Sequence, residues 1–213
     1  MDKNYWNEKY WVRHMQNDDI NNIEYPWINK YEGLIFKKVG SLLDLGCGIG
    51  QYSKYFADNG FTVTAADISE RALSKLSETS DNIKTVKLDM TEPLPFADNT
   101  FDIVFANLSI HFFSKAETEA LMLEIKRILK NGGLFIGSCN SSAAYKYIAD
   151  SSTVIEEGFY LEDGGRSVRL FDRKQFEYFF ADFENVVLTE TETVRFNKSK
   201  NMWEFIYKNN KYN

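Results

Sequence analysis

Three glycines alternate with other residues in a short segment that follows a predicted buried strand. The segment reads Asp44-Leu45-Gly46-Cys47-Gly48-Ile49-Gly50, and a helix is predicted directly after it. Glycines in such a turn allow a tight bend and let a ligand approach the backbone closely. Asp67 ends the next predicted strand, where a carboxylate can accept hydrogen bonds from the hydroxyl groups of a ribose. The turn and the acid together predict a nucleotide-like ligand.

The spacing of these glycines separates two kinds of nucleotide site. Dinucleotide-binding turns have the pattern G-x-G-x-x-G, which brings a pyrophosphate to a helix N-terminus. Here the pattern is G-x-G-x-G, and the acidic Asp44 stands in the strand just before it. A nicotinamide-dependent oxidoreductase is therefore the disfavoured alternative, which titration with each cofactor would decide.

From Val39 to Asn140 the sequence resembles the class I S-adenosylmethionine-dependent methyltransferases. Besides the glycine turn, the resemblance rests on Leu88-Asp89-Met90 after the third strand, on Phe101-Asp102-Ile103-Val104 in the fourth, and on Leu129-Lys130-Asn131-Gly132-Gly133 before the fifth. It implies S-adenosylmethionine as the cofactor and S-adenosylhomocysteine as the product. The cofactor-binding residues that it implies are Asp44, Gly46, Cys47, Gly48, Gly50, Asp67, Ile68, Asp89, Met90 and Asn107, with Tyr10 from an N-terminal arm.

In this resemblance the glycine turn wraps the methionine part of the cofactor and Asp67 holds the ribose. Asp89 is directed towards the adenine amino group, and Met90 offers its backbone amide to the ring. Asn107 follows the fourth strand near the methionine end. A strand-end aspartate can equally be a solvated or capping residue, and Cys47 can be no more than a small residue in the turn.

Methyl transfer from a sulfonium is an in-line displacement, so alignment and the exclusion of water do most of the work. A base is required only when the acceptor must lose a proton. His111 follows the fourth strand, its imidazole titrates in the useful range, and it is the leading candidate for this base. A histidine in this position is also frequently a packing residue.

The acceptor is expected to be a small molecule. The fourth strand is followed by Asn-Leu-Ser-Ile and not by an Asn-Pro-Pro-Tyr motif, which disfavours methylation of adenine or of protein glutamine. The net charge of −6 and the pI near 5.1 disfavour nucleic acid as the partner. Tyr160 and Arg169 are predicted to line the acceptor pocket with His111, and an arginine there would suit an acidic group, whereas Arg166 is expected in a solvated hairpin.

Aromatic residues recur at helical spacing in the N-terminal arm. Trp6 and Tyr10 fall on one stripe, and Trp11 and Met15 fall on a neighbouring one. Because aromatic faces attract a sulfonium cation, Tyr10 is interpreted as part of a lid over the cofactor. Trp11 and Met15 are interpreted as packing residues of an ordinary amphipathic helix.

Apolar periodicity predicts an α/β fold with a doubly wound, mostly parallel seven-stranded sheet, helices on both faces and the last strand antiparallel. Capped helices are expected after Ser69, Ser114 and Asp172. The chain is read as a single domain with a helical arm (1–37), a cofactor-binding core (38–140), a substrate-side insertion (141–171) and a C-terminal helix and strand pair (172–213). Strands are predicted at 41–45, 62–66, 83–88, 101–106, 134–138, 185–194 and 202–207.

The composition of the 213 residues, with 44% hydrophobic and 26% charged residues, is that of a globular protein. Two cysteines and two histidines form no ligand cluster at motif spacing, so no metal is expected. Without an apolar run that could cross a bilayer, or a secretory signal, a cytoplasmic location is expected and no membrane partner. Monomer and homodimer remain open. A cofactor-binding sensor or partner subunit without transferase activity is the alternative function.

Overall fold

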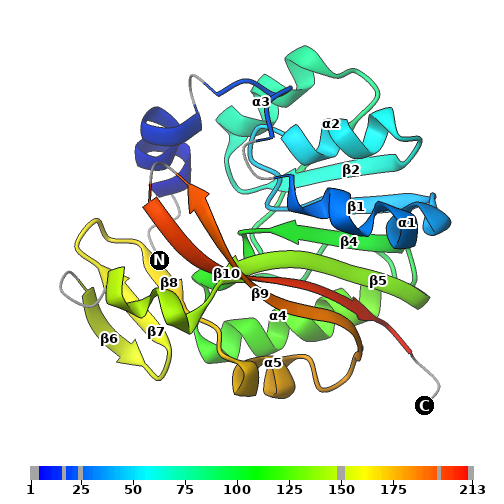
Figure 1. The fold of residues 1–213 in the computed structure, drawn as a ribbon. Helices are drawn as coiled ribbons and strands as arrows, with labels where there is room; N and C mark the ends of the chain where they lie inside the picture. Colours follow the sequence, from blue (N-terminus) through cyan, green and yellow to red (C-terminus); the bar gives the residue numbers. More distant parts are fainter. Residues whose placement is uncertain (1–4, 16–17, 24–25, 148–151, 196–197, 211–213) are drawn as a thin grey trace.

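The computed structural model describes residues 5–15, 18–23, 26–147, 152–195 and 198–210 (Figure 1). At its centre is a seven-stranded sheet with the order β3-β2-β1-β4-β5-β10-β9. Pairing is parallel from β3 to β5, and β10 runs antiparallel to both of its neighbours. The predicted sheet with its last strand antiparallel is thereby confirmed. Its strands are β1 (Ser41–Leu45), β2 (Thr62–Asp67), β3 (Lys84–Lys87), β4 (Phe101–Asn107), β5 (Leu129–Asn140), β9 (Glu184–Arg195) and β10 (Lys198–Lys208).

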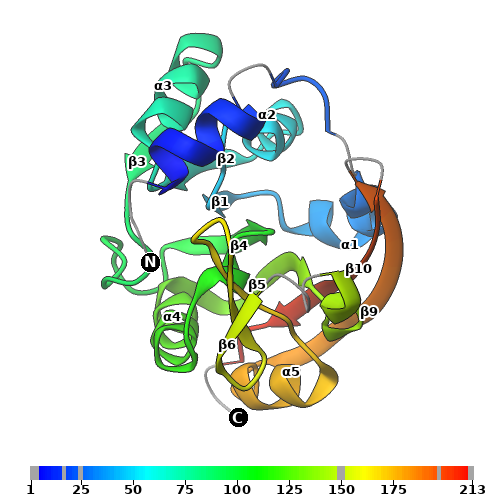
Figure 2. The same cartoon turned by 90° about the vertical axis from the view of Figure 1, so that its left-hand side faces the viewer.

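Helices cover both faces of this sheet (Figures 1 and 2). Residues of the short helix η2 and of α1, α2 and α3 contribute to the core on one face, and residues of α4 and α5 to the core on the other. None of the helices in the described part of the chain is long and apolar enough to cross a membrane. The helices are η1 (Trp6–Met15), η2 (Trp27–Tyr31), α1 (Glu32–Ile35), η3 (Phe36–Lys38), α2 (Gln51–Asp58), α3 (Glu70–Thr79), η4 (Ile110–Phe112), α4 (Lys115–Ile128), η5 (Ser142–Tyr147) and α5 (Arg173–Phe179).

The two faces arise from the alternation of side chains along buried strands. Leu42 packs into the core on the side of α2, and the next residue, Leu43, packs into the core on the side of α4. Phe135 and Ile136 in β5 divide in the same way, with Phe135 towards α4 and α5. Because both faces are covered, these strands are apolar at nearly every position, as expected for a parallel sheet.

Local capping signals in the sequence predict the starts of three helices correctly. Ser69 accepts a hydrogen bond from the backbone N–H of Ala72 at the start of α3. Ser114 with Glu117, and Asp172 with Gln175, form reciprocal capping boxes at the starts of α4 and α5. Each cap satisfies backbone donors that a helix leaves unpaired.

The junction of α4 and β5 differs from the prediction. The fifth strand was expected at 134–138, but α4 ends at Ile128 and β5 already begins at Leu129, which pairs with Phe101. The side-chain amide of Asn209 donates to the carbonyls of Lys126 and Leu129. A residue from the far end of the chain thus satisfies the carbonyls at this junction.

Within the predicted insertion, residues 152–169 form a small antiparallel sheet set beside the main one (Figure 1). Its strands are β6 (Ser152–Glu156), β7 (Phe159–Glu162) and β8 (Ser167–Arg169). Glu156 accepts a hydrogen bond from the backbone N–H of Lys115 at the start of α4, and Arg169 donates to the carbonyl of Phe113. The insertion is therefore attached to the segment that follows β4.

Close packing between β4, β5 and β10 predicts that Gly137 tolerates no side chain. A Cβ at Gly137 would lie 2.4 Å from the ring of Phe205 and 2.5 Å from the carbonyl oxygen of Ala106. We expect Gly137→Ala to lower the free energy of unfolding by about 1–3 kcal/mol, the usual cost of overpacking a core. Gly33→Ala is the matched control, because nothing lies within 4 Å of its added Cβ. Equal urea midpoints for the two variants would contradict the close packing around Gly137.

Candidate active site

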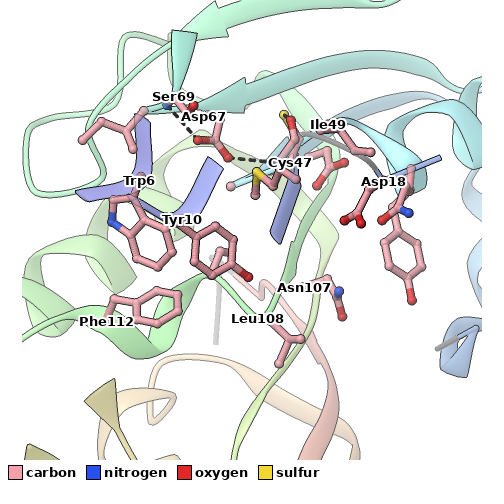
Figure 3. Close-up of a pocket in the computed structure, with 18 of the residues that line it drawn as sticks. Trp6, Tyr10, Asp18, Cys47, Ile49, Asp67, Ser69, Asn107, Leu108 and Phe112 are labelled. Carbon is pink, nitrogen blue, oxygen red and sulfur yellow. Dashed lines mark hydrogen bonds between the residues drawn. The ribbon is translucent and has the colours of Figure 1, made fainter. Parts of the chain in front are cut away.

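A cavity of about 410 Å³ opens at the carboxyl ends of the parallel strands (Figure 3). This is the edge at which open α/β sheets bind ligands. Its walls come from the N-terminal arm, the glycine turn, the ends of β2 and β3, and the segment after β4. It is lined by Trp6, Tyr10, Met15, Asp18, Asp19, Asn22, Ile23, Asp44, Gly46, Cys47, Gly48, Ile49, Gln51, Tyr52, Asp67, Ile68, Ser69, Leu88, Asp89, Met90, Asn107, Leu108, Ser109, Phe112 and Phe113.

The glycine turn forms the floor of this cavity. Gly46, Gly48 and Gly50 all have positive φ angles, of 81°, 55° and 84°, which residues with side chains rarely adopt. A Cβ on Gly46 would lie 2.3 Å from the Cβ of Ser109, so the turn and the segment after β4 are too close for a side chain at position 46. A Cβ on Gly48 would instead meet only the tip of Met15, at 3.1 Å. The space above Gly48 is therefore available to a ligand.

Two buried carboxylates lie side by side in this floor. Asp67 accepts hydrogen bonds from the backbone N–H groups of Gly48 and Ser69, both at 2.8 Å. Asp44 accepts one from the hydroxyl of Ser53 at 2.5 Å. Burial raises the pKa of Asp44 to about 7, and the nearby charge of Asp67 raises it further; burial also raises the pKa of Asp67. A cationic ligand would stabilise both carboxylates in their ionised form.

The ends of β3 and β4 complete the cavity on either side. After β3, Asp89 accepts hydrogen bonds from the backbone and the hydroxyl of Thr91, and Met90 lies beside it in the wall. After β4, Asn107 is followed by Leu108, which has a φ of 56°. A leucine in this region is strained, and such strain is typical of functional sites. The strained turn brings Leu108 and Ser109 to the cavity wall.

Aromatic rings from the arm and from η4 meet over the cavity (Figure 3). The ring of Trp6 lies 4.9 Å from that of Tyr10 and 4.5 Å from that of Phe112. The arm is attached to α3 by an ion pair between Glu8 and Arg71. Tyr10 lines the cavity, and so does Met15, which was expected only to pack.

Three residues predicted for catalysis or for the acceptor lie elsewhere. The imidazole of His111 is buried behind Phe112, with ring centroids 4.2 Å apart, and His111 is absent from the described lining. Arg169 is 1% exposed, forms an ion pair with Glu156, and has a pKa lowered by burial. Tyr160 lies in β7, also outside the described lining. Arg169 therefore holds the insertion together, because its guanidinium is already used by Glu156 and by backbone carbonyls.

The structure adds polar residues that the sequence patterns did not indicate. Asp18, Asp19 and Asn22 reach the cavity from the arm, and Gln51 donates from the start of α2 to the carbonyl of Asp19 at 2.9 Å. The sequence signal for them is the adjacent acidic pair Asp18-Asp19 in an arm rich in aromatic residues. Their place depends on the packing of the arm against α2, which no local pattern encodes.

A family model described as a methyltransferase domain matches residues 43–137, which include the glycine turn and the ends of β1 to β4. This match supports the resemblance to the class I S-adenosylmethionine-dependent methyltransferases. The family resemblance seen in the sequence is thereby confirmed.

Individual relatives agree with this methyltransferase family. An uncharacterized methyltransferase of Synechocystis is 33% identical over 104 residues, which are 49% of this chain and 49% of that protein. A solved structure from Pyrococcus horikoshii is 27% identical, with a TM-score of 0.71, over 95% of this chain and 99% of its own. A 1,6-didemethyltoxoflavin-N1-methyltransferase of Burkholderia thailandensis, solved with S-adenosylhomocysteine, has a TM-score of 0.73 at 17% identity over 97% and 86%, and shows the fold alone. The chain matches half or less of the curated relatives' length.

The cavity fits the cofactor of this methyltransferase family. The open space above Gly48 allows the close backbone approach that a ligand in a glycine turn requires. Among the described lining residues five are aspartates and none is a lysine, arginine or histidine. This balance suits S-adenosylmethionine, which carries a sulfonium and an ammonium group. We infer that Asp67 would hold the ribose and Asp89 the adenine amino group.

A side chain at position 48 is expected to block the binding of this cofactor. In Gly48→Val the side chain would enter the space above the turn, so the affinity for S-adenosylhomocysteine, measured by calorimetry, should fall at least tenfold. Gly60→Val is the matched control, because Gly60 also has a positive φ, of 88°, but lies outside the described lining. Both variants carry similar backbone strain. Unchanged affinity in a folded Gly48→Val protein would place the cofactor elsewhere.

The buried Asp44 should make stability depend on pH. Between pH 4 and pH 7 the folded protein keeps the Asp44 proton, because the folded pKa is about 7, and the unfolded chain has lost it. Stability from this group is therefore present at low pH and lost as pH rises to 7. The Asp44→Asn variant has no carboxylate to ionise at this position, so its free energy of unfolding should not fall in this way. Relative to the wild type, it should gain about 2 kcal/mol between pH 5 and pH 8, which is roughly 4–8 °C in melting temperature.

Asp58→Asn, on the exposed side of α2, serves as the control for this effect and should show no such trend. A difference between Asp44→Asn and the wild type that stays constant with pH would mean that the folded protein does not hold the Asp44 proton.

Proposed function

We propose that the protein transfers a methyl group from S-adenosylmethionine to a small-molecule acceptor. The observation that carries the proposal is the order of polar residues along one edge of the sheet. Asp89 after β3, Asp67 at the end of β2, Asp44 in β1 and Asn107 at the end of β4 all line one cavity. A cofactor with adenine, ribose and methionine parts in a row matches this arrangement.

In this proposal the cofactor supplies a methyl group on a positively charged sulfur, and the chain supplies alignment and a dry site. The glycine turn and the strand-end aspartates hold the cofactor in one orientation. Trp6, Tyr10 and Phe112 cover the cavity and exclude water. Residues 1–37 then act as a lid and residues 141–171 as an outer wall, which the attachment of Arg169 to Phe113 supports.

A small acceptor is supported by the Burkholderia thailandensis neighbour, which is named for a small-molecule substrate. An acidic group on that acceptor has lost its main support, because Arg169 is buried in an ion pair with Glu156. We propose instead a neutral or cationic acceptor, which the acidic pair Asp18 and Asp19 in the cavity wall favours. The role of His111 as a base stays a prediction, and its place behind Phe112 argues for packing.

The test is the formation of S-adenosylhomocysteine from S-adenosylmethionine in the presence of fractionated cell metabolites. Asp67→Ala should weaken S-adenosylhomocysteine binding by about tenfold to a hundredfold, because hydrogen bonds to a charged group contribute about 1.5–3 kcal/mol. Asp81→Ala, at an exposed position after α3, is the control and should leave the affinity unchanged. Cofactor binding without turnover on any fraction would favour the alternative, a sensor or partner subunit.

A further inference from the structure

The side-chain amide of Asn107 is held in one orientation by two donors. Its oxygen accepts a hydrogen bond from the indole N–H of Trp27 at 3.0 Å and another from the hydroxyl of Ser138 at 2.6 Å. An indole N–H can only donate, so the group that faces Trp27 must be the amide oxygen and not the amide nitrogen. The two contacts therefore assign the positions of the amide oxygen and the amide nitrogen.

Both donors are themselves fixed. Trp27 is 1% exposed, and its ring stacks on that of Phe105 with an interplanar angle of 17°. Ser138 is fully buried in β5, where it is the direct partner of Asn107 in the β4–β5 register. The backbone N–H of Leu108 also donates to the carbonyl of Ser138. Rotating the amide would leave the buried indole N–H facing a second donor.

With its oxygen bound to Trp27 and Ser138, Asn107 presents its amide nitrogen to the cavity that it lines. Figure 3 shows this nitrogen on the side of the glycine turn and the oxygen on the opposite side. The cavity thus has a neutral hydrogen-bond donor at the end of β4, while Asp44, Asp67 and Asp89 contribute carboxylates along β1, β2 and β3.

The order of the strands indicates which part of the cofactor meets this donor. Neighbouring strands lie about 4.8 Å apart, so an extended ligand whose adenine and ribose lie near Asp89 and Asp67 must place its methionine part over β1 and β4. The adenine amino group and the ribose hydroxyls donate to carboxylates. In the methionine part the carboxylate is the group that requires donors, and the described lining offers it no cation.

We propose that the amide nitrogen of Asn107 donates a hydrogen bond to the methionine carboxylate of the bound cofactor, and that Trp27 and Ser138 are positioning residues for this contact. The inference rests on the cofactor of the proposed function but not on any acceptor. It gives Trp27, a residue outside the described lining, a role in cofactor binding through the orientation of one amide.

Calorimetry with two ligands tests the contact without any acceptor. S-adenosylhomocysteine has the amino-carboxypropyl end, whereas 5′-methylthioadenosine keeps the adenine and ribose but lacks that end. In Asn107→Asp at pH 8, one oxygen can still accept from Trp27 and Ser138, while the other replaces the donor by a negative charge. We expect the affinity for S-adenosylhomocysteine to fall about 30- to 100-fold and that for 5′-methylthioadenosine to change less than twofold.

The positioning residues are tested in the same assay. Trp27→Phe keeps the ring and removes the N–H, and Ser138→Ala removes the hydroxyl. Each should weaken S-adenosylhomocysteine binding by about threefold to tenfold and leave 5′-methylthioadenosine binding unchanged, because the amide gains freedom to turn. Tyr31→Phe is the control. It removes a hydroxyl in the same arm, but this hydroxyl bonds Glu204 and not Asn107.

Three outcomes would overturn the inference. Equal losses for both ligands would mean that Asn107→Asp distorts the whole cavity. Unchanged affinity for both ligands would mean that the nitrogen does not face the carboxylate. Where a variant loses affinity, a melting temperature near that of the wild type excludes unfolding as the cause. If Asn107→Asp weakens the binding of S-adenosylhomocysteine but Trp27→Phe and Ser138→Ala do not, Trp27 and Ser138 have no positioning role. Failure of the wild type to form S-adenosylhomocysteine with any metabolite fraction would instead contradict the proposed function.

Discussion

The burial of two carboxylates at the ends of adjacent parallel strands is the constraint on which the site depends. Asp44 and Asp67 are each less than one tenth exposed, and burial raises the pKa of both. Such groups are costly to bury unless donors face them, and here the donors are the hydroxyl of Ser53 and the backbone N–H groups of Gly48 and Ser69. The positive φ angles of the glycine turn bring the Gly48 N–H to Asp67. A cationic ligand would complete this compensation, which links the stability of the fold to its binding function.

The other side of the cavity depends on contacts between segments far apart in the chain. Trp27 from the arm and Ser138 from β5 meet at Asn107, at the end of β4. The arm is also held by Lys30 and Tyr31, which bond to the buried carboxylate of Glu204 in β10. The segment that covers the cavity and the residues that set its polarity are therefore parts of one packed unit. This explains how an arm rich in aromatic residues can position single polar groups.

The insertion has a different role from the one its arginines suggested. Arg169 lies between the rings of Phe159 and Phe179 and bonds to Glu156 and to the carbonyl of Phe113. Arg166, expected in a solvated hairpin, pairs with Glu162 and lies 5.8 Å from the ring centre of Phe112. Arg169 thus contacts the cavity wall through the carbonyl of Phe113, and Arg166 through the ring of Phe112. They leave the described walls of the cavity negative in charge.

Features with a local physical cause could be predicted from the sequence. The capping boxes at Ser114 and Asp172, the apolar runs of the buried strands and the glycine turn depend on residues a few positions apart. Their patterns are therefore visible in the sequence. The start of β5, the burial of Arg169 and the orientation of the Asn107 amide were decided by the tertiary structure. Each of these depends on a partner that is distant in sequence, such as Asn209, Phe113 or Trp27, and only packing brings such partners together.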